Sequence, residues 1–398
     1  MLQPHQKLRI VVTGMVGQYP LGGVAWDYFH YVLGLAELGH DVCYHEDTWS
    51  WPYDPSLGYP VETPDGSVQF LADFFARHAP QLQDRWHYLH LHDRNFGMSR
   101  QQFDAFARSA DIFLNVSGAS FFPDSLNPSC RKVFVDTDPG YNQIVMAERP
   151  AWSPHVDRWI EQVRAHDVHL TYAENILGND CVIPDVGIAW KTTRPVVTLT
   201  PWSQVREQSP PADAPFTTIM SWGYFGGDLV HKGVKYDAKA TEYARFHDLP
   251  KRTRVPLVLA VGGEHQPADQ IRADGWQWID GREVSRTPDA YRQFIAQSAG
   301  EWSIAKNVYV ATRSGWFSSR TACYLAAARP AVVQDTGWRR YIPSGEGVIA
   351  FETIDQAVAA LEEVRAHYSR HRKAAWAIAR DCLSAEKVLP HMIDTIYS

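Results

Sequence analysis

The fold of this chain is decided by residues 308–337, VYVATRSGWFSSRTACYLAAARPAVVQDTG. The apolar, β-branched run VYVA predicts a strand, and a glycine-containing loop follows it. The small residues after the loop predict a helix over residues 318–329, which stops there because Pro330 disfavours a helical conformation in the residue before it. The run AVVQ predicts a second strand. This order of elements predicts a Rossmann-like unit.

The loop and the start of this helix carry groups that bind phosphate. Backbone N–H groups at a helix N-terminus, together with the helix dipole, attract anions. Ser318 and Ser319 add hydroxyl donors, and Arg320 or Arg313 offers a guanidinium that binds two phosphate oxygens at once. The pattern predicts a diphosphate site that needs no metal ion.

The first half of the chain also alternates strands and helices. Apolar residues recur at helical spacing from Trp26 to Ala36, and Gly39 ends that helix. Such alternation predicts a parallel sheet with helices on both faces. The predicted strands cover residues 8–12, 41–47, 111–116 and 132–136.

A chain of 398 residues is too long for one compact core, which predicts two domains and a cleft between them. The proline-rich residues 184–215 show no helical periodicity, and the alternation begins again after them. We therefore expect Rossmann-like domains over residues 1–195 and 196–375. We expect residues 376–398 to form a helical segment, and the sequence leaves open whether this segment crosses back to the first domain.

Composition narrows the class of protein. The longest apolar runs fall short of the roughly 20 residues of a membrane-spanning helix, and no secretion signal is seen, so we expect a cytoplasmic protein. The net charge of −7 gives no general attraction for nucleic acid. The 5 cysteines are widely spaced, which argues against disulfides and a cysteine zinc site. A small-molecule enzyme fits best.

The first loop resembles a dinucleotide-binding site in the order of its elements but not in the spacing of its glycines. The strand, turn, helix and Glu46 imitate the dinucleotide fingerprint, but the glycines do not form GxGxxG. Gly22 and Gly23 either let a ligand or another backbone approach the helix start or merely shape the turn. The sequence leaves both readings open.

Two segments carry a resemblance to a known family. SGWFSSRTACYLAAARPAVVQDTG, residues 314–337, resembles the phosphate loop, helix and following strand of the GT-B glycosyltransferases. YPLGGVAWDYFHYVLGLAELGHDV, residues 19–42, is similar to that family's N-terminal loop and first helix. The resemblance implies an α/β fold of two Rossmann-like domains whose parallel sheets face a central cleft. It implies an acceptor on the N-terminal domain and a nucleotide-sugar on the C-terminal one.

One segment departs from the family pattern. Many retaining members carry a glutamate that binds ribose after the second strand, whereas here residues 338–347 read WRRYIPSGEG, with arginine at that place. Glu346 is a substitute or a solvated turn residue. Ribose binding therefore stays open.

For catalysis we expect Arg320 to stabilise the leaving diphosphate and Asp138, at the end of a strand facing the cleft, to act as the base. His90 and His92 are an alternative source of a base, and a metal site is not expected there. The resemblance alone implies that Asp280 and Arg282 lie where the family binds the nucleobase. The expected donor-binding residues are Gly22, Gly23, Gly315, Trp316, Phe317, Ser318, Ser319, Asp280, Arg282, Asp335, Thr336 and Gly337.

The acceptor is expected to contact residues of the first domain. Trp49 and Trp51 lie in an aromatic loop of the kind that stacks on sugars or bases. Asp136 and Glu174 would hold hydroxyl groups, or they cap and order local segments.

These features predict a metal-independent hexosyltransferase that moves a sugar from a nucleotide diphosphate donor, without further cofactor, to an acceptor hydroxyl. A basic segment, residues 231–254, suggests as an alternative a DNA-modifying glycosyltransferase. A nucleotide-sugar epimerase and a non-catalytic sugar-nucleotide-binding protein are further alternatives. The donor base and sugar, the acceptor, the stereochemical outcome and the oligomeric state stay open.

Overall fold

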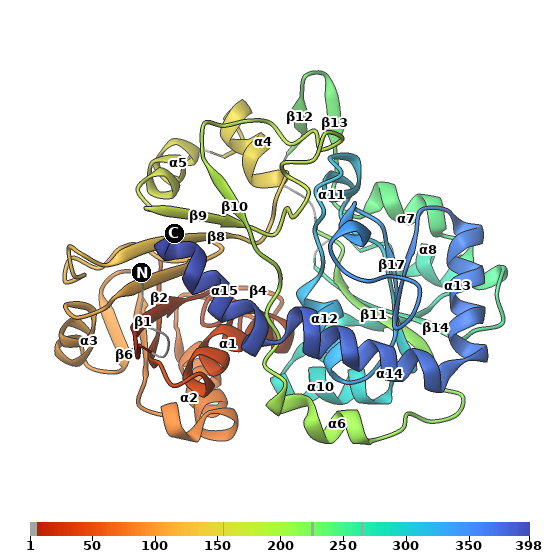
Figure 1. Ribbon diagram of the computed structural model, residues 1–398, viewed down its shortest axis with the longest axis horizontal. Coiled ribbons are helices and arrows are strands. Elements are labelled where there is room, and N and C mark those ends of the chain that lie inside the picture. The colour runs from red at the N-terminus through yellow and green to blue at the C-terminus, as the bar shows by residue number, and fades with distance from the viewer. Residues whose placement is uncertain (1–5, 154, 224–226, 264–265) are drawn as a thin grey trace.

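The computed structural model describes residues 6–153, 155–223, 227–263 and 266–398. Two sheets, each covered by helices, form two α/β domains that lie side by side (Figure 1). The first sheet uses strands between Arg9 and Thr192, and the second uses strands between Phe216 and Phe351. The predicted pair of Rossmann-like domains is confirmed, whereas the limits at residues 195 and 375 stay predictions.

The first sheet has 8 strands in the order β10-β9-β8-β7-β1-β2-β5-β6, all parallel to their neighbours except β6. Strand β1 lies in the middle, and Val11 and Val12 are fully buried there. The four strands predicted in this half are all present. The strands are β1 (Arg9–Thr13), β2 (Asp41–Thr48), β5 (Trp86–His90), β6 (Arg94–Gly97), β7 (Ile112–Val116), β8 (Arg131–Asp136), β9 (Val168–Thr171) and β10 (Trp190–Thr192).

Helix α1 (Gly22–Glu37) runs between the first sheet and the second domain. Its apolar residues are buried on almost every side, as expected of a helix covered by two domains. The chain leaves the helix through Gly39, whose φ of 89° favours glycine. The other elements of this domain are the helices α2 (Asp65–His78), α3 (Arg100–Ala107), α4 (Tyr141–Glu148) and α5 (Val156–Arg164), the 3₁₀ turn Pro80–Leu82, and the hairpin of β3 (Tyr53–Asp54) and β4 (Tyr59–Pro60).

The second sheet has 6 parallel strands in the order β15-β14-β11-β16-β17-β18. These are β11 (Phe216–Ser221), β14 (Leu257–Gly262), β15 (Gln277–Asp280), β16 (Gly300–Ser303), β17 (Ala331–Gln334) and β18 (Val348–Phe351). The helices around it are α6 (Ser203–Glu207), α7 (Ala240–Phe246), α8 (Ala268–Ala273), α9 (Gly281–Ser285), α10 (Pro288–Gln297), α11 (Asn307–Ala311), α12 (Ser319–Ala326), α13 (Ile354–Ala366) and α14 (Tyr368–Ile378). Short turns Thr200–Trp202, Leu249–Lys251 and Trp338–Arg340 and a π-helix, Ala379–Leu383, complete this part.

One element of the deciding stretch differs from the prediction. The run VYVA forms helix α11, not a strand, and the sheet position before the loop is taken by β16. A short apolar run fits a buried helix as well as a strand, and here Val308 and Tyr309 pack against residues of α4. Helix α12 begins at Ser319 as predicted but ends at Ala326, before Ala328 takes a left-handed φ of 52°.

Two segments tie the domains together (Figure 1). Helix α15 (Ala385–Tyr397) returns to the first domain and packs on α1. The hairpin of β12 (Leu229–His231) and β13 (Val234–Tyr236) reaches from the second domain onto α4, where His231 Nδ1 lies 2.6 Å from Glu148 Oε1. The domains are thus held at two separate places.

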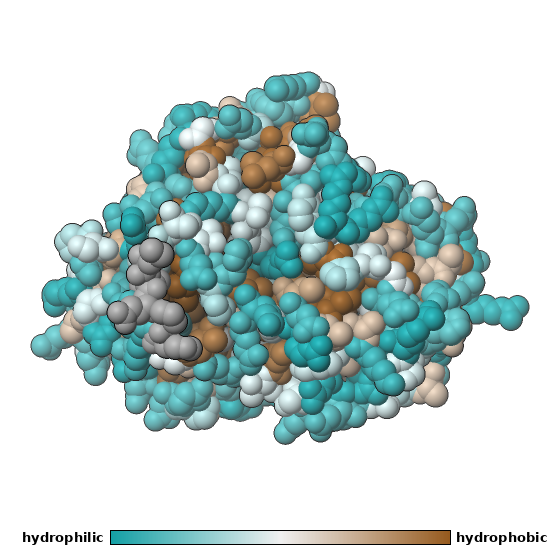
Figure 2. All heavy atoms as spheres, viewed as in Figure 1, coloured by the Kyte–Doolittle hydropathy of each residue, from teal (hydrophilic) through white to brown (hydrophobic). Residues whose placement is uncertain are grey.

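The face shown in Figure 2 is mostly hydrophilic, and its hydrophobic residues appear in small separate patches. None of the described helices has the length and apolar character that crossing a membrane requires.

The contact between α1 and α15 can be tested by comparing the stability of two glycine-to-alanine variants. A methyl group at Gly34 would lie 2.4 Å from Ala385 Cβ, whereas a methyl group at Gly66 in α2 would meet nothing within 4 Å. Alanine favours a helix over glycine at both positions. We expect Gly34→Ala to lower the free energy of unfolding by about 1–3 kcal/mol through overpacking, and Gly66→Ala to leave it unchanged or raise it. Equal effects of the two variants in urea unfolding would disprove the contact.

Candidate functional site

A cavity of about 620 Å³ lies between the two domains. Its second-domain wall is made by residues at the carboxyl ends of β11, β14 and β15, where open α/β sheets bind ligands. Its first-domain wall includes the start of α1 and the β3–β4 hairpin. Of the predicted site residues, those that line the cavity are Gly23, Arg282, Trp316, Ser318, Ser319 and Arg320.

The N-terminus of α12 opens onto this cavity. Ser318 precedes the helix, and its side chain makes no capping hydrogen bond to the first turn. The first N–H groups of a helix have no partner within the helix, so those of α12 are available to an anion. The site therefore offers backbone donors together with the hydroxyl groups of Ser318 and Ser319.

Four cationic side chains line the same cavity. Arg282 is paired with Asp280, with 2.7 Å between Nη2 and Oδ2. Arg320 donates from Nε to Glu301 Oε1 at 2.7 Å and from Nη1 to the carbonyl oxygen of Ile219 at 2.8 Å. Lys306 Nζ lies 2.7 Å from Asp138 Oδ2. These three cations are paired with carboxylates.

Lys239 is the fourth cation, and it differs from the others. It is only 9% exposed, and within the described part of the chain its ammonium has no ion pair or hydrogen bond. Burial lowers the pKa of Lys239 well below its usual value, and the charges of Arg320 and Lys306 add to this effect. It also stands at the N-terminal end of α7, where the helix dipole is positive. An anion in the cavity would offset the desolvation of the Lys239 ammonium and its repulsion from Arg320, Lys306 and the start of α7.

Lys239 was predicted only as part of the basic segment 231–254. The structure buries it, whereas Lys235 of the same segment lies at the surface with its Nζ 2.6 Å from Asp228. Spacing along the chain gave no signal that separates the two lysines.

Asp27 is the only carboxylate among the described residues that line the cavity. It lies on α1 and faces α12, where Ser319 hydrogen-bonds its side chain and Arg320 provides an opposite charge. Asp27 is an exposed residue where it lines the cavity, and the protein packed around it raises its pKa to about 7 against the effect of Arg320 and Ser319. The sequence prediction missed it, although it is the first charged residue in the apolar helix that follows Gly22 and Gly23.

The two aspartates predicted at the end of β8 lie outside the cavity lining. Asp138 binds Lys306 through one oxygen and accepts a hydrogen bond from Tyr309 through the other. Asp136 is fully buried and accepts from Asn142, Gln143, Thr171 and the backbone N–H of Asp138. Burial raises the pKa of Asp136 to about 6. Its contacts order the turn before α4.

The other predicted acceptor residues also lie outside the cavity lining. Glu174 pairs with Arg194, with 2.5 Å between Oε1 and Nη2. Trp49 and Trp51 are each 51% exposed on the loop that leads to Tyr53, and Tyr53 does line the cavity. An acceptor role for these residues stays a prediction.

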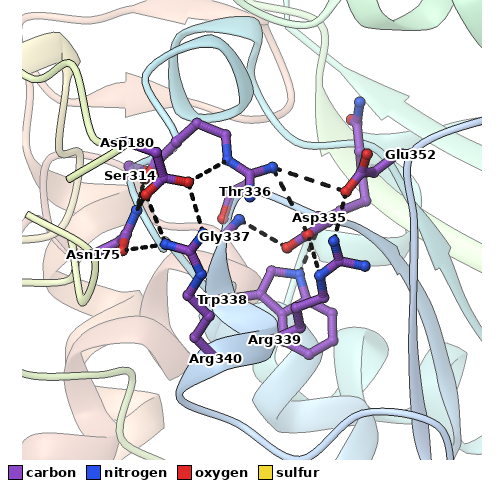
Figure 3. A network of polar contacts seen from close by, with 12 residues as sticks. Asn175, Asp180, Ser314, Asp335, Thr336, Gly337, Trp338, Arg339, Arg340 and Glu352 are labelled. Atoms are coloured by element: carbon purple, nitrogen blue, oxygen red, sulfur yellow. Dashed lines mark hydrogen bonds and ion pairs between the residues drawn. The ribbon is translucent and has the colours of Figure 1, made fainter. Parts of the chain in front are cut away.

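Asp335, Thr336 and Gly337 belong to a polar network across the domain boundary (Figure 3). Arg340 binds Asp180 through both nitrogens at 2.7 and 2.8 Å, and Asn175 donates to the carbonyl oxygen of Arg313 at 2.7 Å. Within the second domain, Arg339 Nε lies 3.0 Å from Asp335 Oδ2. These three predicted donor residues do not line the cavity, and their donor contact stays a prediction.

Four further predicted donor residues also lie next to the cavity lining. Gly22 allows close packing of α1 on α10, because a methyl group there would lie 2.3 Å from Thr287 O. Gly315 allows a similar close approach, because a methyl group there would lie 2.5 Å from the backbone nitrogen of Asn175. Asp280 accepts from the backbone N–H of Arg282 at 2.9 Å and pairs with its guanidinium, and Phe317 is buried. Of the possibilities left open for the paired glycines, close approach of another backbone is the one observed at Gly22, whereas its contact with a donor stays a prediction.

No group of three or more metal-ligating side chains occurs among the described residues. No protein-family model matches the chain, and no curated protein matches its sequence.

Solved structures do match over almost the whole chain. An alpha-glucosyltransferase in complex with UDP and DNA containing an HMU base is 12% identical, with a TM-score of 0.62 over 99% of this chain and 100% of that one. HepE of Anabaena, in complex with UDP and glucose, is 10% identical, with a TM-score of 0.55 over 98% and 100%. AviGT4, a glycosyltransferase involved in avilamycin A biosynthesis, is 14% identical, with a TM-score of 0.50 over 98% and 97%. These likenesses show that the chain has the GT-B fold.

Proposed function

We propose that this protein is a glycosyltransferase that moves a sugar from a nucleoside diphosphate donor to a hydroxyl group of an acceptor. The observation that carries the proposal is Lys239, a buried ammonium without a described partner in the cavity between the domains. Arg320 and the open N-terminus of α12 line the same cavity. A diphosphate fits this combination, because it presents several anionic oxygens to cations and backbone donors at once.

The same groups would act during transfer. As the acceptor oxygen bonds to the anomeric carbon, the bond from that carbon to the phosphate oxygen breaks, and negative charge builds up on the leaving diphosphate. Donors and cations fixed in a water-poor site stabilise such charge more strongly than water does. Because Lys239, Arg320 and α12 supply this stabilisation, we propose that transfer needs no metal ion.

We place the nucleoside end of the donor at the carboxyl end of β15. Arg282 lines the cavity there and is oriented by Asp280, whose Oδ2 lies 2.7 Å from its Nη2. A methyl group at Gly281 would lie 2.6 Å from Gly262 N, so two backbones meet closely beneath this end of the cavity. The orientation of Arg282 supports a contact with the base or ribose.

We place the acceptor on the first-domain side, where Tyr53 and the exposed Trp49 and Trp51 lie along one loop. Asp138 stays our proposed base, since it follows Thr137, which lines the cavity, although Asp138 itself lies outside the lining. Its two oxygens bind Lys306 and Tyr309, so it must release one of them to take a proton from the acceptor.

Replacing Lys239 tests the donor site. We expect Lys239→Met to weaken binding of a nucleotide-sugar about 10- to 100-fold, because a hydrogen bond to a charged group contributes about 1.5–3 kcal/mol. The measurement is isothermal titration calorimetry with the tightest-binding member of a panel of UDP-, GDP-, ADP- and dTDP-glucose. Lys235→Met is the matched control, since that lysine is exposed, and its dissociation constant should stay within twofold of wild type. Equal affinities of all three proteins would refute this role of Lys239.

Two other functions of the same cavity predict different products. A nucleotide-sugar epimerase converts the donor without any acceptor, and a binding protein leaves it intact. The proposed transferase releases free nucleoside diphosphate at a rate that rises with acceptor concentration.

A DNA acceptor is the second candidate, because the glucosyltransferase with the highest of the TM-scores given above was solved with DNA. The charges argue against it here. In the basic segment, Lys235 pairs with Asp228, Arg245 with Glu242 and Arg252 with Asp248. These pairs involve three of the seven lysines and arginines of the segment and so weaken its attraction for the phosphates of a nucleic acid backbone.

This charge pairing predicts weak DNA binding. At about 150 mM salt we expect a dissociation constant for duplex DNA no tighter than the roughly 10⁻⁴–10⁻⁶ M of non-specific binding. We also expect no change on Lys232→Gln/Lys235→Gln, measured by fluorescence anisotropy. Nanomolar binding that the double variant weakens would favour the DNA acceptor.

A further inference from the structure

We propose that Asp27 meets the donor as a neutral carboxylic acid, so that binding of a nucleotide-sugar takes up a proton from solution at slightly alkaline pH. The inference rests on the proposed function, because it requires a diphosphate in the cavity.

The geometry places a carboxylate where the diphosphate is expected. Asp27 projects from α1 of the first domain toward α12 of the second, next to Ser319 and Arg320. Both of these residues line the cavity, and the first turn of α12 has no capping side chain. Asp27 is thus the one described carboxylate at a site otherwise built for an anion.

Two anions cannot share such a site at low cost. Burial already raises the pKa of Asp27 to about 7, although Arg320 and Ser319 favour its charged form. A diphosphate bound to the same arginine and serine would compete for both partners and add negative charge nearby. Each effect raises the pKa of Asp27 further. The protonated side chain can then donate a hydrogen bond to a phosphate oxygen.

The other ionisable groups that face Asp27 keep one charge state near neutral pH. Arg320 stays cationic. Burial raises the pKa of the tyrosines and the cysteine around Asp27 above their usual values, so they stay neutral there. These groups are Tyr28 and Tyr31 on α1, Tyr172 after β9, Tyr291 on α10 and Cys323 on α12.

Among the described residues that line the cavity, Lys239 is a second group that can take up a proton. Burial lowers its pKa well below the usual value, which favours the neutral amine in the free protein, and this amine can also gain a proton when an anion enters. The experiment must therefore separate the aspartate from the lysine.

Because donor binding takes up a proton, the affinity for the donor depends on pH. Well below pH 7, Asp27 is protonated with or without the donor, so its contribution to affinity is constant. Above pH 7, the free protein loses this proton while the complex keeps it, and affinity falls by up to tenfold per pH unit until the pKa in the complex is reached. A nucleotide-sugar is the right probe, because its phosphates lack the ionisation near pH 6 that a terminal phosphate has.

The test is isothermal titration calorimetry of the tightest-binding nucleotide-sugar at pH 8 in HEPES and in Tris, buffers that have different ionisation enthalpies and supply no phosphate to the site. For the wild-type protein we expect an uptake approaching one proton per donor bound. We expect Asp27→Asn to remove most of this uptake and to bind the donor at pH 8 as tightly as wild type or more tightly, because the amide is neutral and still donates. The wild-type measurement alone decides whether a proton is taken up, even if the variant fails to fold.

Lys239→Arg identifies the group that takes up the proton, because arginine stays charged throughout this range. Uptake that persists in Lys239→Arg and is lost in Asp27→Asn supports the inference. The opposite pattern assigns the proton to Lys239 and overturns it, as does donor binding without uptake in the wild type. Failure of every nucleotide-sugar to bind would instead overturn the proposed function, and this inference with it.

Discussion

The buried side chain of Lys239 gives the cavity between the domains its need for an anion. Removing a charge from water without a partner costs on the order of several kcal/mol. Here the cost is increased by Arg320 and Lys306, which line the same cavity, and by the N-terminal end of α7. The buried charge of Lys239 does not stabilise the fold. It favours binding of an anion, because the anion supplies the missing partner.

The rest of the structure holds this cavity between two domains. The start of α1 is fixed to the second domain where Gly23 N donates to Ser285 at 3.0 Å and Trp26 Nε1 donates to Pro288 O at 3.1 Å. Helix α15 and the β12–β13 hairpin connect the domains at other places, and the network around Asp180 and Arg340 adds ion pairs (Figure 3). Asp27 on α1 and Ser319 on α12 therefore meet across the boundary between the domains.

The sequence predicted the fold well because periodicity is a local property. The strands β1, β2, β7 and β8 and the helices α1 and α12 follow from apolar spacing and from their flanking glycine and proline. The exception is α11, whose short apolar run is decided by packing against the first domain. At the site, Ser318, Ser319 and Arg320 were found because a helix N-terminus binds anions wherever it occurs. Lys239 and Asp27 were missed because only the three-dimensional fold brings them to that helix. Asp335 and Gly337 follow β17 directly, but adjacency in sequence could not reveal that they turn toward Asn175 and Asp180.

The most direct test of the central claim is a crystal structure of the protein with a bound nucleotide-sugar. We expect density for the diphosphate in the cavity between the domains, with its oxygens in contact with Lys239 and the first turn of α12. Density for the nucleotide-sugar elsewhere on the protein, with Lys239 making no contact to it, would rule out this donor site.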